Sequence, residues 1–275
     1  MTVQSNPVKP SINRRQQSLL AHIRSNGKGD VDSLSRWFQV TPQTIRRDLN
    51  TLGQLRLIIR VHGGAIAPGG VSQSEQLVNL DYSTRSMLGH DAKEAIGKRV
   101  AKIIPNDASM FINIGTTTES VARYLTNHIG LLAITNNINI ANTLRKSNAI
   151  KVMTAGGLVR HEDGGIVGDA TEEFVNQFKV DYAVISCSAL EEDGTMLDFD
   201  IREVKVTQAI IRNARSVILA CDATKFDRKA PVRLGQIDMV DYVVLNETPP
   251  AAFKEACIRA GVELLCLDME SSSGN

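Results

Sequence analysis

The sequence predicts an α/β protein in two parts, a small basic segment rich in helices followed by a larger domain of parallel strands and helices. Three observations support this prediction. The chain has 275 residues, enough for two hydrophobic cores, and 43% of them are apolar. Residues 1–67 carry ten Lys and Arg against three Asp, whereas the remainder carries 21 Lys and Arg against 27 Asp and Glu. Beyond residue 91, short apolar runs alternate with helical patterns.

The composition excludes several classes of protein. The first residues, MTVQSNPVKPSINRR, hold no apolar core of signal-peptide length, and no run reaches the roughly 18 apolar residues of a membrane span. We therefore expect a cytoplasmic protein with no membrane segment. The four cysteines lie far apart without a CxxC pair, at Cys187, Cys221, Cys257 and Cys266. This spacing favours reduced, buried thiols, and the dispersed histidines complete no metal motif, so neither a metal nor a cofactor is predicted.

The basic segment, residues 12–67, has the pattern of a helix-turn-helix. Apolar residues recur at helical spacing at Ile12, Leu19, Leu20 and Ile23. The run Gly27-Lys28-Gly29 then interrupts the pattern, and Asp30 is placed to cap a second short helix. Thr41 can cap a third helix, whose first position suits Pro42 because no N–H is needed there.

The expected third helix, in the run TPQTIRRDLNTL, has two contrasting faces. Ile45, Leu49 and Leu52 fall on one side at about 100° per residue. The opposite sector carries Gln43, Arg46, Arg47 and Asn50. Arginine can bond guanine bidentately, and Gln or Asn can read adenine. An ordinary solvated face is the alternative, but the capped start, the preceding short helix and the basic charge together favour DNA binding.

The run LRLIIRVHGGAI predicts a β-hairpin after this helix. Leu57–Val61 forms the first expected strand, Gly63 and Gly64 the turn, and Ala65-Ile66 the return strand. Arg60 and His62 near the tip could contact the DNA backbone. A hairpin that merely completes the small core is the alternative, and for His62 the sequence does not separate the two.

The run VTPQTIRRDLNTL followed by HGGA resembles the signature of DeoR-type bacterial transcriptional regulators. The resemblance implies a winged helix-turn-helix domain that binds double-stranded operator DNA. It places the recognition helix from Thr41 to Leu49, a stretch that includes Thr44.

The second part begins after residues 68–90, a polar and glycine-containing stretch predicted to be a linker. Over 91–267 the pattern changes. A helix that carries Ile96 and Val100 on one side leads to a strand at Met110–Ile114. Later apolar runs read LLAIT, IKVMT, YAVIS, SVILA and YVVL. Short apolar strands between helices predict a buried, mostly parallel sheet.

The loops after these strands are rich in groups that bind anions, and ligands collect at the carboxyl ends of such strands. The loops contain Gly115, Thr116, Thr117 and Thr118, then Thr135, Asn136 and Asn137, and then Gly156 and Gly157. Glycine lets backbone amides face a ligand, and the following helix presents its positive end. We predict a phosphate site with Lys225 as counter-charge. The alternative is a capping box between Thr116 and Glu119, which needs no ligand.

The run LDFDIREVK (197–205) supplies carboxylates to the same domain. Asp198, Asp200 and Glu203 could bond the hydroxyl groups of a polyol, or act as acid and base on a sugar. Acidic residues before a helix also serve as partners of its dipole, and this alternative stays open for the aspartates.

The runs INIGTTTES, ITNNINIAN, FDIREVK and CDATKFDR resemble the effector domain of DeoR-type repressors, so the resemblance extends from Arg14 to Leu265. It implies a fold related to ribose-5-phosphate isomerase and glucosamine-6-phosphate deaminase, used to bind a phosphorylated sugar or polyol, with glycerol-3-phosphate as the expected inducer. Gly115–Thr118 would hold the phosphate, Lys225 would neutralise it, and Glu203 would meet a hydroxyl. The active form would be a homo-oligomer, a dimer or a tetramer.

Two rival functions follow from the same pattern. One is an isomerase or deaminase of this fold with an added DNA-binding segment. The other is a regulator that answers to a different sugar phosphate. Family members that respond to glycerol-3-phosphate tend to have GISG where this chain has Ser186–Ala189, tyrosine in place of Ile201, and glycine in place of Asp227. Added side chains near a pocket can exclude a ligand.

Overall fold

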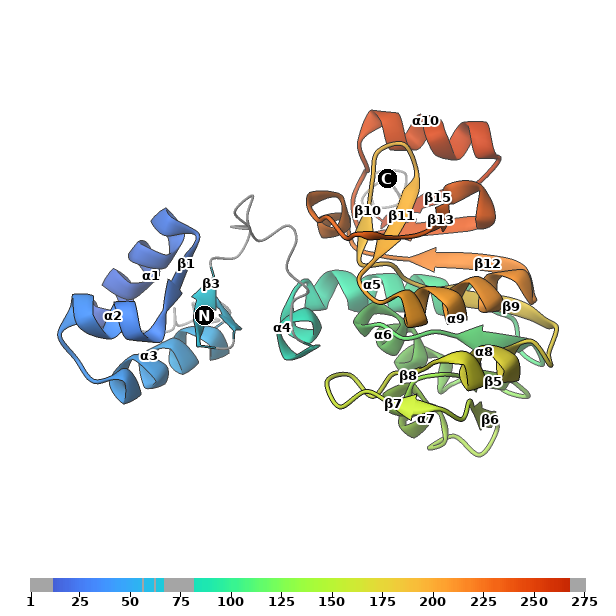
Figure 1. Ribbon diagram of the computed structural model, residues 1–275, viewed down its shortest axis with the longest axis horizontal. Helices are drawn as coiled ribbons and strands as arrows, with labels where there is room; N and C mark the ends of the chain where they lie inside the picture. Colours follow the sequence, from blue (N-terminus) through green and yellow to red (C-terminus); the bar gives the residue numbers. More distant parts are fainter. Residues whose placement is uncertain (1–11, 56, 62, 67–81, 268–275) are drawn as a thin grey trace, which may run out of the picture. The chain divides into compact units, whose positions relative to one another are not determined.

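The computed structural model describes residues 12–55, 57–61, 63–66 and 82–267 (Figure 1). The chain divides into two compact units, one ending at Leu88 and the other beginning at Gly89. His62 and most of the expected linker, residues 68–81, lie outside the described residues.

Three helices and a small antiparallel sheet form the body of the first unit. The helices are α1 (Arg14–Asn26), α2 (Val31–Phe38) and α3 (Pro42–Gln54). The strands are β1 (Lys28–Asp30), β2 (Ile59–Val61) and β3 (Gly64–Ile66), in the order β1-β3-β2. The predicted helix-turn-helix and wing are therefore confirmed.

The predicted caps of the first unit are also confirmed. The Asp30 side chain accepts from the amide of Ser33 at 2.8 Å, and Thr41 accepts from the amide of Thr44 at 3.2 Å. The buried side chains of the three helices form one core, which includes Leu19, Ile23, Leu34, Ile45, Leu49 and Leu52. The strand β1 was not expected: Lys28–Asp30 pairs with β3, so the wing belongs to a three-stranded sheet.

A fourth helix, α4 (Tyr82–Met87), lies within the stretch expected to be a linker and belongs to the first unit. It packs against β2. The hydroxyl of the buried Thr84 donates to the Arg60 carbonyl oxygen at 3.0 Å. The helix is therefore joined to the wing by a specific hydrogen bond.

The second unit is built on a parallel sheet of seven strands in the order β15-β14-β12-β9-β4-β5-β6. The central strands are β4 (Ser109–Ile112), β9 (Val180–Ile185) and β12 (Ala214–Ala220). The outer strands are β5 (Leu132–Thr135), β6 (Lys151–Thr154), β14 (Tyr242–Leu245) and β15 (Glu263–Cys266). The predicted parallel sheet is confirmed, and β15 extends it by a strand that the sequence analysis did not foresee.

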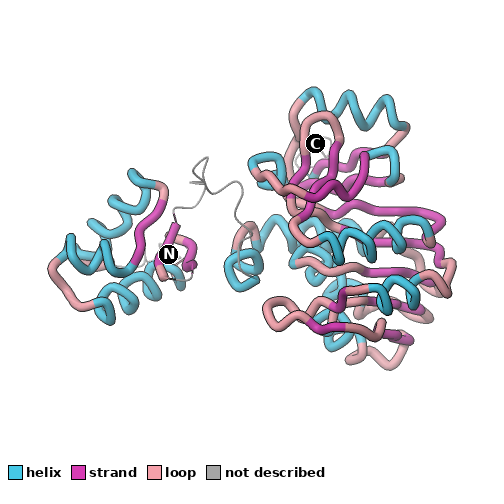
Figure 2. The backbone as a smooth tube through the Cα atoms, in the orientation of Figure 1, coloured by secondary structure: helices cyan, strands magenta, loops and turns pink. Residues whose placement is uncertain are grey.

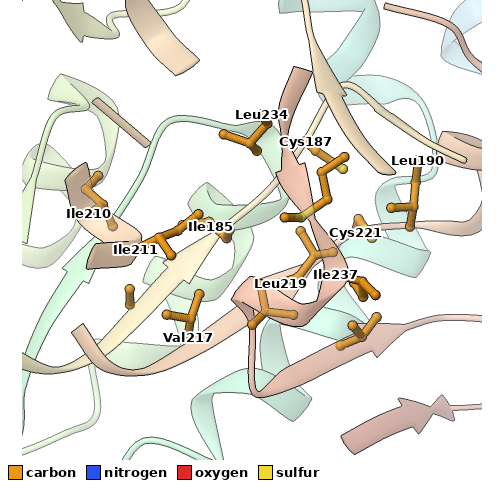
Figure 3. Packing of buried hydrophobic residues seen from close by; sticks show 14 of the residues in the cluster. Ile185, Cys187, Leu190, Ile210, Ile211, Val217, Leu219, Cys221, Leu234 and Ile237 are labelled. Carbon is orange, nitrogen blue, oxygen red and sulfur yellow. The ribbon is translucent and has the colours of Figure 1, made fainter. Parts of the chain in front are cut away.

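Helices lie on both faces of this sheet (Figure 2). One buried cluster joins the sheet to α5 (His90–Ala101), α6 (Thr116–Leu125) and α7 (Ile138–Leu144). The other joins it to α8 (Asp169–Val175), α9 (Ile201–Arg212) and α10 (Ala251–Ala260). In the second cluster, Val217 and Leu219 of the sheet pack with Ile210 of α9 (Figure 3). All four cysteines are buried and free, as predicted.

Two small antiparallel sheets complete the second unit. One contains β10 (Ala189–Leu190), β11 (Thr195–Asp198) and β13 (Val232–Gln236). The other is a hairpin of β7 (Leu158–Val159) and β8 (Ile166–Val167). Two short 3-10 helices follow strands, η1 (Ala223–Asp227) and η2 (Ile237–Met239).

The strand order creates a switch point between β4 and β9. From β4 the chain runs outward through β5 and β6, then returns to β9 on the other side of β4 and continues to β12. The connections at the carboxyl ends of β4 and β9 therefore diverge, and ligands of such sheets bind in the crevice this leaves.

Within the described ranges, every helix is too short or too polar to span a membrane. The same ranges contain no cluster of three or more His, Cys, Asp or Glu side chains arranged to hold a metal ion.

Candidate nucleic-acid interface and effector site

The polar face of α3 is open to solvent. Gln43, Arg46, Arg47 and Asn50 are exposed, while Thr44 is half-buried, with its hydroxyl oxygen 2.9 Å from that of Thr41. The opposite face is held in the core, where the buried Asp48 accepts from Gln16 Nε2 at 3.0 Å. The helix is thus anchored on one side, and its exposed side carries donors suited to bases and phosphates.

Arg60, expected to reach the DNA backbone, is turned toward α3. Its Nε donates to Asn50 Oδ1 at 3.1 Å, and its NH1 donates to the Gly64 carbonyl. Burial and the nearby charge of Arg46 lower the pKa of Arg60. The guanidinium therefore holds the wing against α3, a role that the sequence did not indicate.

In the second unit, the expected phosphate loop opens α6 at the carboxyl end of β4. Gly115 precedes the helix with φ of 148° and, as a glycine, has no side chain with which to cap it. The alternative capping box does not form, because Glu119 Oε1 accepts from Asn139 Nδ2 at 2.9 Å and Asn137 Nδ2 at 3.2 Å. A helix that begins at a glycine presents its positive end and backbone amides at the carboxyl end of β4, which favours an anion.

The three threonines of this loop differ in their surroundings. Thr116 is half-buried, whereas Thr117 and Thr118 are buried. The Thr118 hydroxyl lies 2.7 Å from the Asn113 carbonyl oxygen and 2.8 Å from that of Gly115, so it fixes the loop. Backbone amides and Thr116 are the groups placed to meet a ligand.

The loop after β5 contributes one unsatisfied group. Thr135 and Asn137 are bonded within the protein: the Thr135 hydroxyl donates to the Ile112 carbonyl at 2.7 Å, and Asn137 Oδ1 accepts from the Asn139 amide at 2.7 Å. By contrast, Asn136 Oδ1 and Asn113 Oδ1 are buried without a partner within the described structure. Buried oxygens of this kind call for a donor, such as a hydroxyl group or a water molecule.

Gly156 and Gly157 shape the loop between β6 and β7. The Gly156 carbonyl accepts from the Thr171 hydroxyl at 3.0 Å, and a Cβ on Gly157 would lie 2.4 Å from that hydroxyl. Gly157 therefore allows close contact with α8, which explains its presence without a ligand, whereas a Cβ on Gly156 would meet no atom within 4 Å.

Two buried lysines supply positive charge at the carboxyl ends of the central strands. Lys225, predicted from the sequence, lies in η1 after β12, and Lys93 lies in α5. Burial alone would raise the pKa of Asp222, but Lys225 and Lys93 hold it below its ordinary value. Lys93 was missed, although its place in the apolar stripe with Ile96 and Val100 is an unusual one for lysine.

Arg160, on the turn between β7 and β8, was also missed. It binds Asp163 through Nε at 3.0 Å and NH2 at 2.6 Å, and Glu203 Oε2 through NH1 at 2.7 Å. Asp200 lies 3.5 Å from the same NH1 and caps α9. Glu203 is therefore paired with Arg160. The only signal in the sequence for this arginine was its spacing from an acidic residue, in Arg160-x-x-Asp163.

The Glu203 carboxyl has a raised pKa. Burial and the neighbouring Asp198 raise its pKa to about 7, against the opposing charge of Arg160. Asp198 Oδ1 in turn accepts from the Ser188 hydroxyl at 2.8 Å. This cluster offers both donors and acceptors near neutral pH, as a ligand with several hydroxyl groups requires.

The two halves of the second-unit site lie at one edge of the sheet. A Cβ on Gly115 would lie 3.4 Å from Ser186 Cβ, which places the end of β9 beside the phosphate loop. A Cβ on Gly165 would lie 2.7 Å from Ile114 and 3.1 Å from Arg160 NH2, which brings the β7–β8 turn to the end of β4. The start of α6 and the acidic cluster around Arg160 thus lie at the same edge of the sheet, by the switch point.

Comparison with known proteins identifies the family of both units. Residues 15–69 match the family described as the DeoR-like helix-turn-helix domain, and residues 89–247 match the DeoR C terminal sensor domain. The chain belongs to the DeoR family. As a DeoR-family member with this DNA-binding domain, it is a transcriptional regulator and not an isomerase or deaminase.

Several relatives of this DeoR-family chain are similar along most of their length. The glycerol-3-phosphate regulon repressor of Escherichia coli (strain K12) is 40% identical over 254 residues, covering 92% of this chain and 98% of the relative. The repressor of the same description from Haemophilus influenzae is 42% identical over 235 residues, covering 86% and 89%. Among solved structures, ribose 5-phosphate isomerase A of Methanocaldococcus jannaschii aligns with 50% of this chain and 55% of its own at 15% identity, with a TM-score of 0.38.

Proposed function

We propose that this regulator represses a carbon-metabolism operon and leaves its operator when a phosphorylated polyol, glycerol-3-phosphate, binds at the carboxyl ends of β4, β9 and β12. The observation that carries the proposal is the start of α6 at Gly115, at the carboxyl end of β4, with the buried Lys225 and Lys93 at the same edge of the sheet. Helix amides and lysine charge together suit a phosphate. The two glycerol-3-phosphate regulon repressors at 40% and 42% identity support the choice of ligand.

The hydroxyl groups of the polyol would meet the acidic cluster. Glu203 and Asp200, held by Arg160, offer carboxylate oxygens, and Asn136 Oδ1 offers an acceptor that has no partner. A ligand hydroxyl can donate a hydrogen bond to each of these oxygens.

Operator binding would use the exposed face of α3, with Arg46 and Arg47 as the main cations. We propose that the protein acts in the cytoplasm as a dimer or tetramer, so that two DNA-binding units contact two half-sites. Linked units gain effective concentration on DNA without new contacts. The ligand releases DNA only if it binds the released arrangement more tightly than the DNA-bound one.

A second candidate ligand is another sugar phosphate. The Ser186 side chain lies beside Gly115, and Ile201 at the start of α9 is 56% exposed. These side chains alter the size and polarity of the crevice where glycerol-3-phosphate responders tend to have glycine and tyrosine. Such changes can exchange one phosphorylated ligand for another without loss of the phosphate loop.

Thermal unfolding with added ligands tests the proposal. A ligand at 100 times its dissociation constant adds about 2.7 kcal/mol of stability, so glycerol-3-phosphate is expected to raise Tm while glycerol does not. A rise in Tm with another sugar phosphate, and none with glycerol-3-phosphate, would favour the second candidate. Lys225→Met and Lys93→Met are expected to abolish the shift, whereas Lys98→Met, an exposed lysine of the same helix α5, is the matched control. Unchanged shifts in both buried-lysine variants would place the site elsewhere.

A further inference from the structure

The first turn of α1 is tied to the middle of α3 through the buried carboxylate of Asp48. This group accepts from Gln16 Nε2 at 3.0 Å and from Arg15 Nε at 2.5 Å. Gln16 is itself held by the N-cap residue Asn13, whose side chain accepts from the Gln16 amide at 2.9 Å. The start of α1 therefore has a fixed position against the helix that carries the exposed DNA-binding face.

The bond to Asp48 uses one part of the Arg15 guanidinium and leaves the rest available. Asp48 takes the Nε donor, and within the described parts of the chain NH1 and NH2 have no hydrogen-bond partner. The Arg15 side chain is 40% exposed, whereas that of Asp48 is 5% exposed. NH1 and NH2 together carry four N–H donors, and such a planar fork suits the oxygens of a phosphate.

Arg15 and the wing meet α3 on different sides. Asp48 and Asn50 are two residues apart, which is about 200° around a helix. Arg60 of β2 bonds Asn50, whereas Arg15 of α1 bonds Asp48. The exposed Arg47 precedes Asp48 and adds a second cation near Arg15. The recognition helix is thus accompanied by the wing on one flank and by the start of α1 on the other.

A helix in the major groove of DNA meets phosphates on both of its flanks. The groove is about 12 Å wide, close to the 10–12 Å diameter of a helix with its side chains, so a phosphate backbone borders each flank. Contacts to these backbones fix the register and orientation of the protein without reading the sequence. A cation held beside the flank away from the wing is therefore placed to meet the second backbone.

We propose that Arg15 binds a backbone phosphate of the operator on the side of the groove away from the wing, and that Asp48 is the residue that positions it. The inference rests on the proposed operator binding through α3 and adds a contact from α1. It also gives Asp48, which lies among the core residues of the first unit, a role in DNA binding.

Fluorescence anisotropy with the full-length protein tests this inference, on a duplex enriched from a randomised pool. Arg15→Gln keeps a donor for Asp48 but removes the charge. The slope of log affinity against log salt concentration is expected to become shallower by about one, and affinity to fall by the same factor for all duplexes. The matched control is Arg24→Gln, an exposed arginine in the last turn of α1, which is expected to keep the wild-type slope.

Two further measurements separate phosphate binding from a structural effect. Arg15→Lys keeps the charge and is expected to keep the wild-type salt slope. Replacement of single phosphates by neutral methylphosphonates is expected to weaken wild-type binding at positions on both backbones that border the groove. One of these positions is expected to lose its effect in Arg15→Gln. Melts followed by the fluorescence of Trp37 show whether each variant is folded in the assay.

Specific results would overturn the inference while operator binding stands. They are an unchanged salt slope in folded Arg15→Gln, an equal change of slope in Arg24→Gln, a slope in Arg15→Lys as shallow as in Arg15→Gln, or sensitive phosphates on one backbone alone. The last result needs only the wild type, so it decides the question even if Arg15→Gln does not fold. Failure of the wild type to enrich any duplex would overturn operator binding through α3 as well.

Discussion

Replacing Glu203 by Gln is expected to weaken the dependence of the second unit's stability on pH. The pKa of Glu203 is raised from 4.5 to about 7 by burial and by Asp198, against the charge of Arg160. A carboxyl whose pKa is higher in the folded state stabilises that state fully below its unfolded pKa, and this contribution is lost as pH rises through the folded pKa. For these two pKa values the loss between pH 5.5 and pH 8 is about 2 kcal/mol.

Urea denaturation at several pH values, followed by far-UV circular dichroism, measures this loss. The single tryptophan, Trp37, lies in α2, so its fluorescence reports unfolding of the first unit separately. Gln at position 203 retains an oxygen for Arg160 but does not titrate. The matched control is Glu162→Gln, an exposed carboxyl on the same β7–β8 turn, which is expected to keep the wild-type profile. Parallel pH profiles for wild type and Glu203→Gln would refute the reasoning.

Three other predictions concern DNA binding and packing. The double variant Arg46→Ala, Arg47→Ala is expected to weaken operator binding by at least about 1–3 kcal/mol and to reduce the salt slope, as measured by fluorescence anisotropy; an unchanged slope would contradict phosphate contact. Asp48→Ala leaves Gln16 without its buried acceptor and is expected to cost about 1–3 kcal/mol in Trp37 fluorescence melts. Gly97→Ala would place a Cβ 2.8 Å from the Ser120 backbone, so overpacking of α5 on α6 should cost about 1–3 kcal/mol in thermal denaturation.

Periodicity and caps were enough to predict the first unit. Asp30 and Thr41 act locally, within three residues of the amides they bind, so the sequence contains their whole environment. The strand β1 could not be predicted in this way. Lys28–Asp30 is too short to show alternation, and it becomes a strand only because β3, more than thirty residues later, supplies a partner.

In the candidate site of the second unit, the residues that lie in one uninterrupted stretch of sequence after a strand could be predicted. Gly115 and Lys225 each follow a strand, and the sheet brings the strand ends together. Glu203 was assigned to a ligand hydroxyl, but its nearest partner is Arg160, 43 residues earlier in the chain. That pairing depends on how the β7–β8 turn meets α9, which no local pattern encodes. Lys93 was overlooked because helical periodicity was used to select apolar residues only.

The hydrogen bond from Thr84 to the backbone of Arg60 has a practical consequence for dissecting this protein. A fragment that stops at residue 67, where the winged domain was expected to end, would discard the helix that supports strand β2. We expect such a truncated piece to fray at its hairpin and to lose sequence discrimination. A fragment that ends at Leu88 would retain α4, and we expect it to keep the hairpin paired.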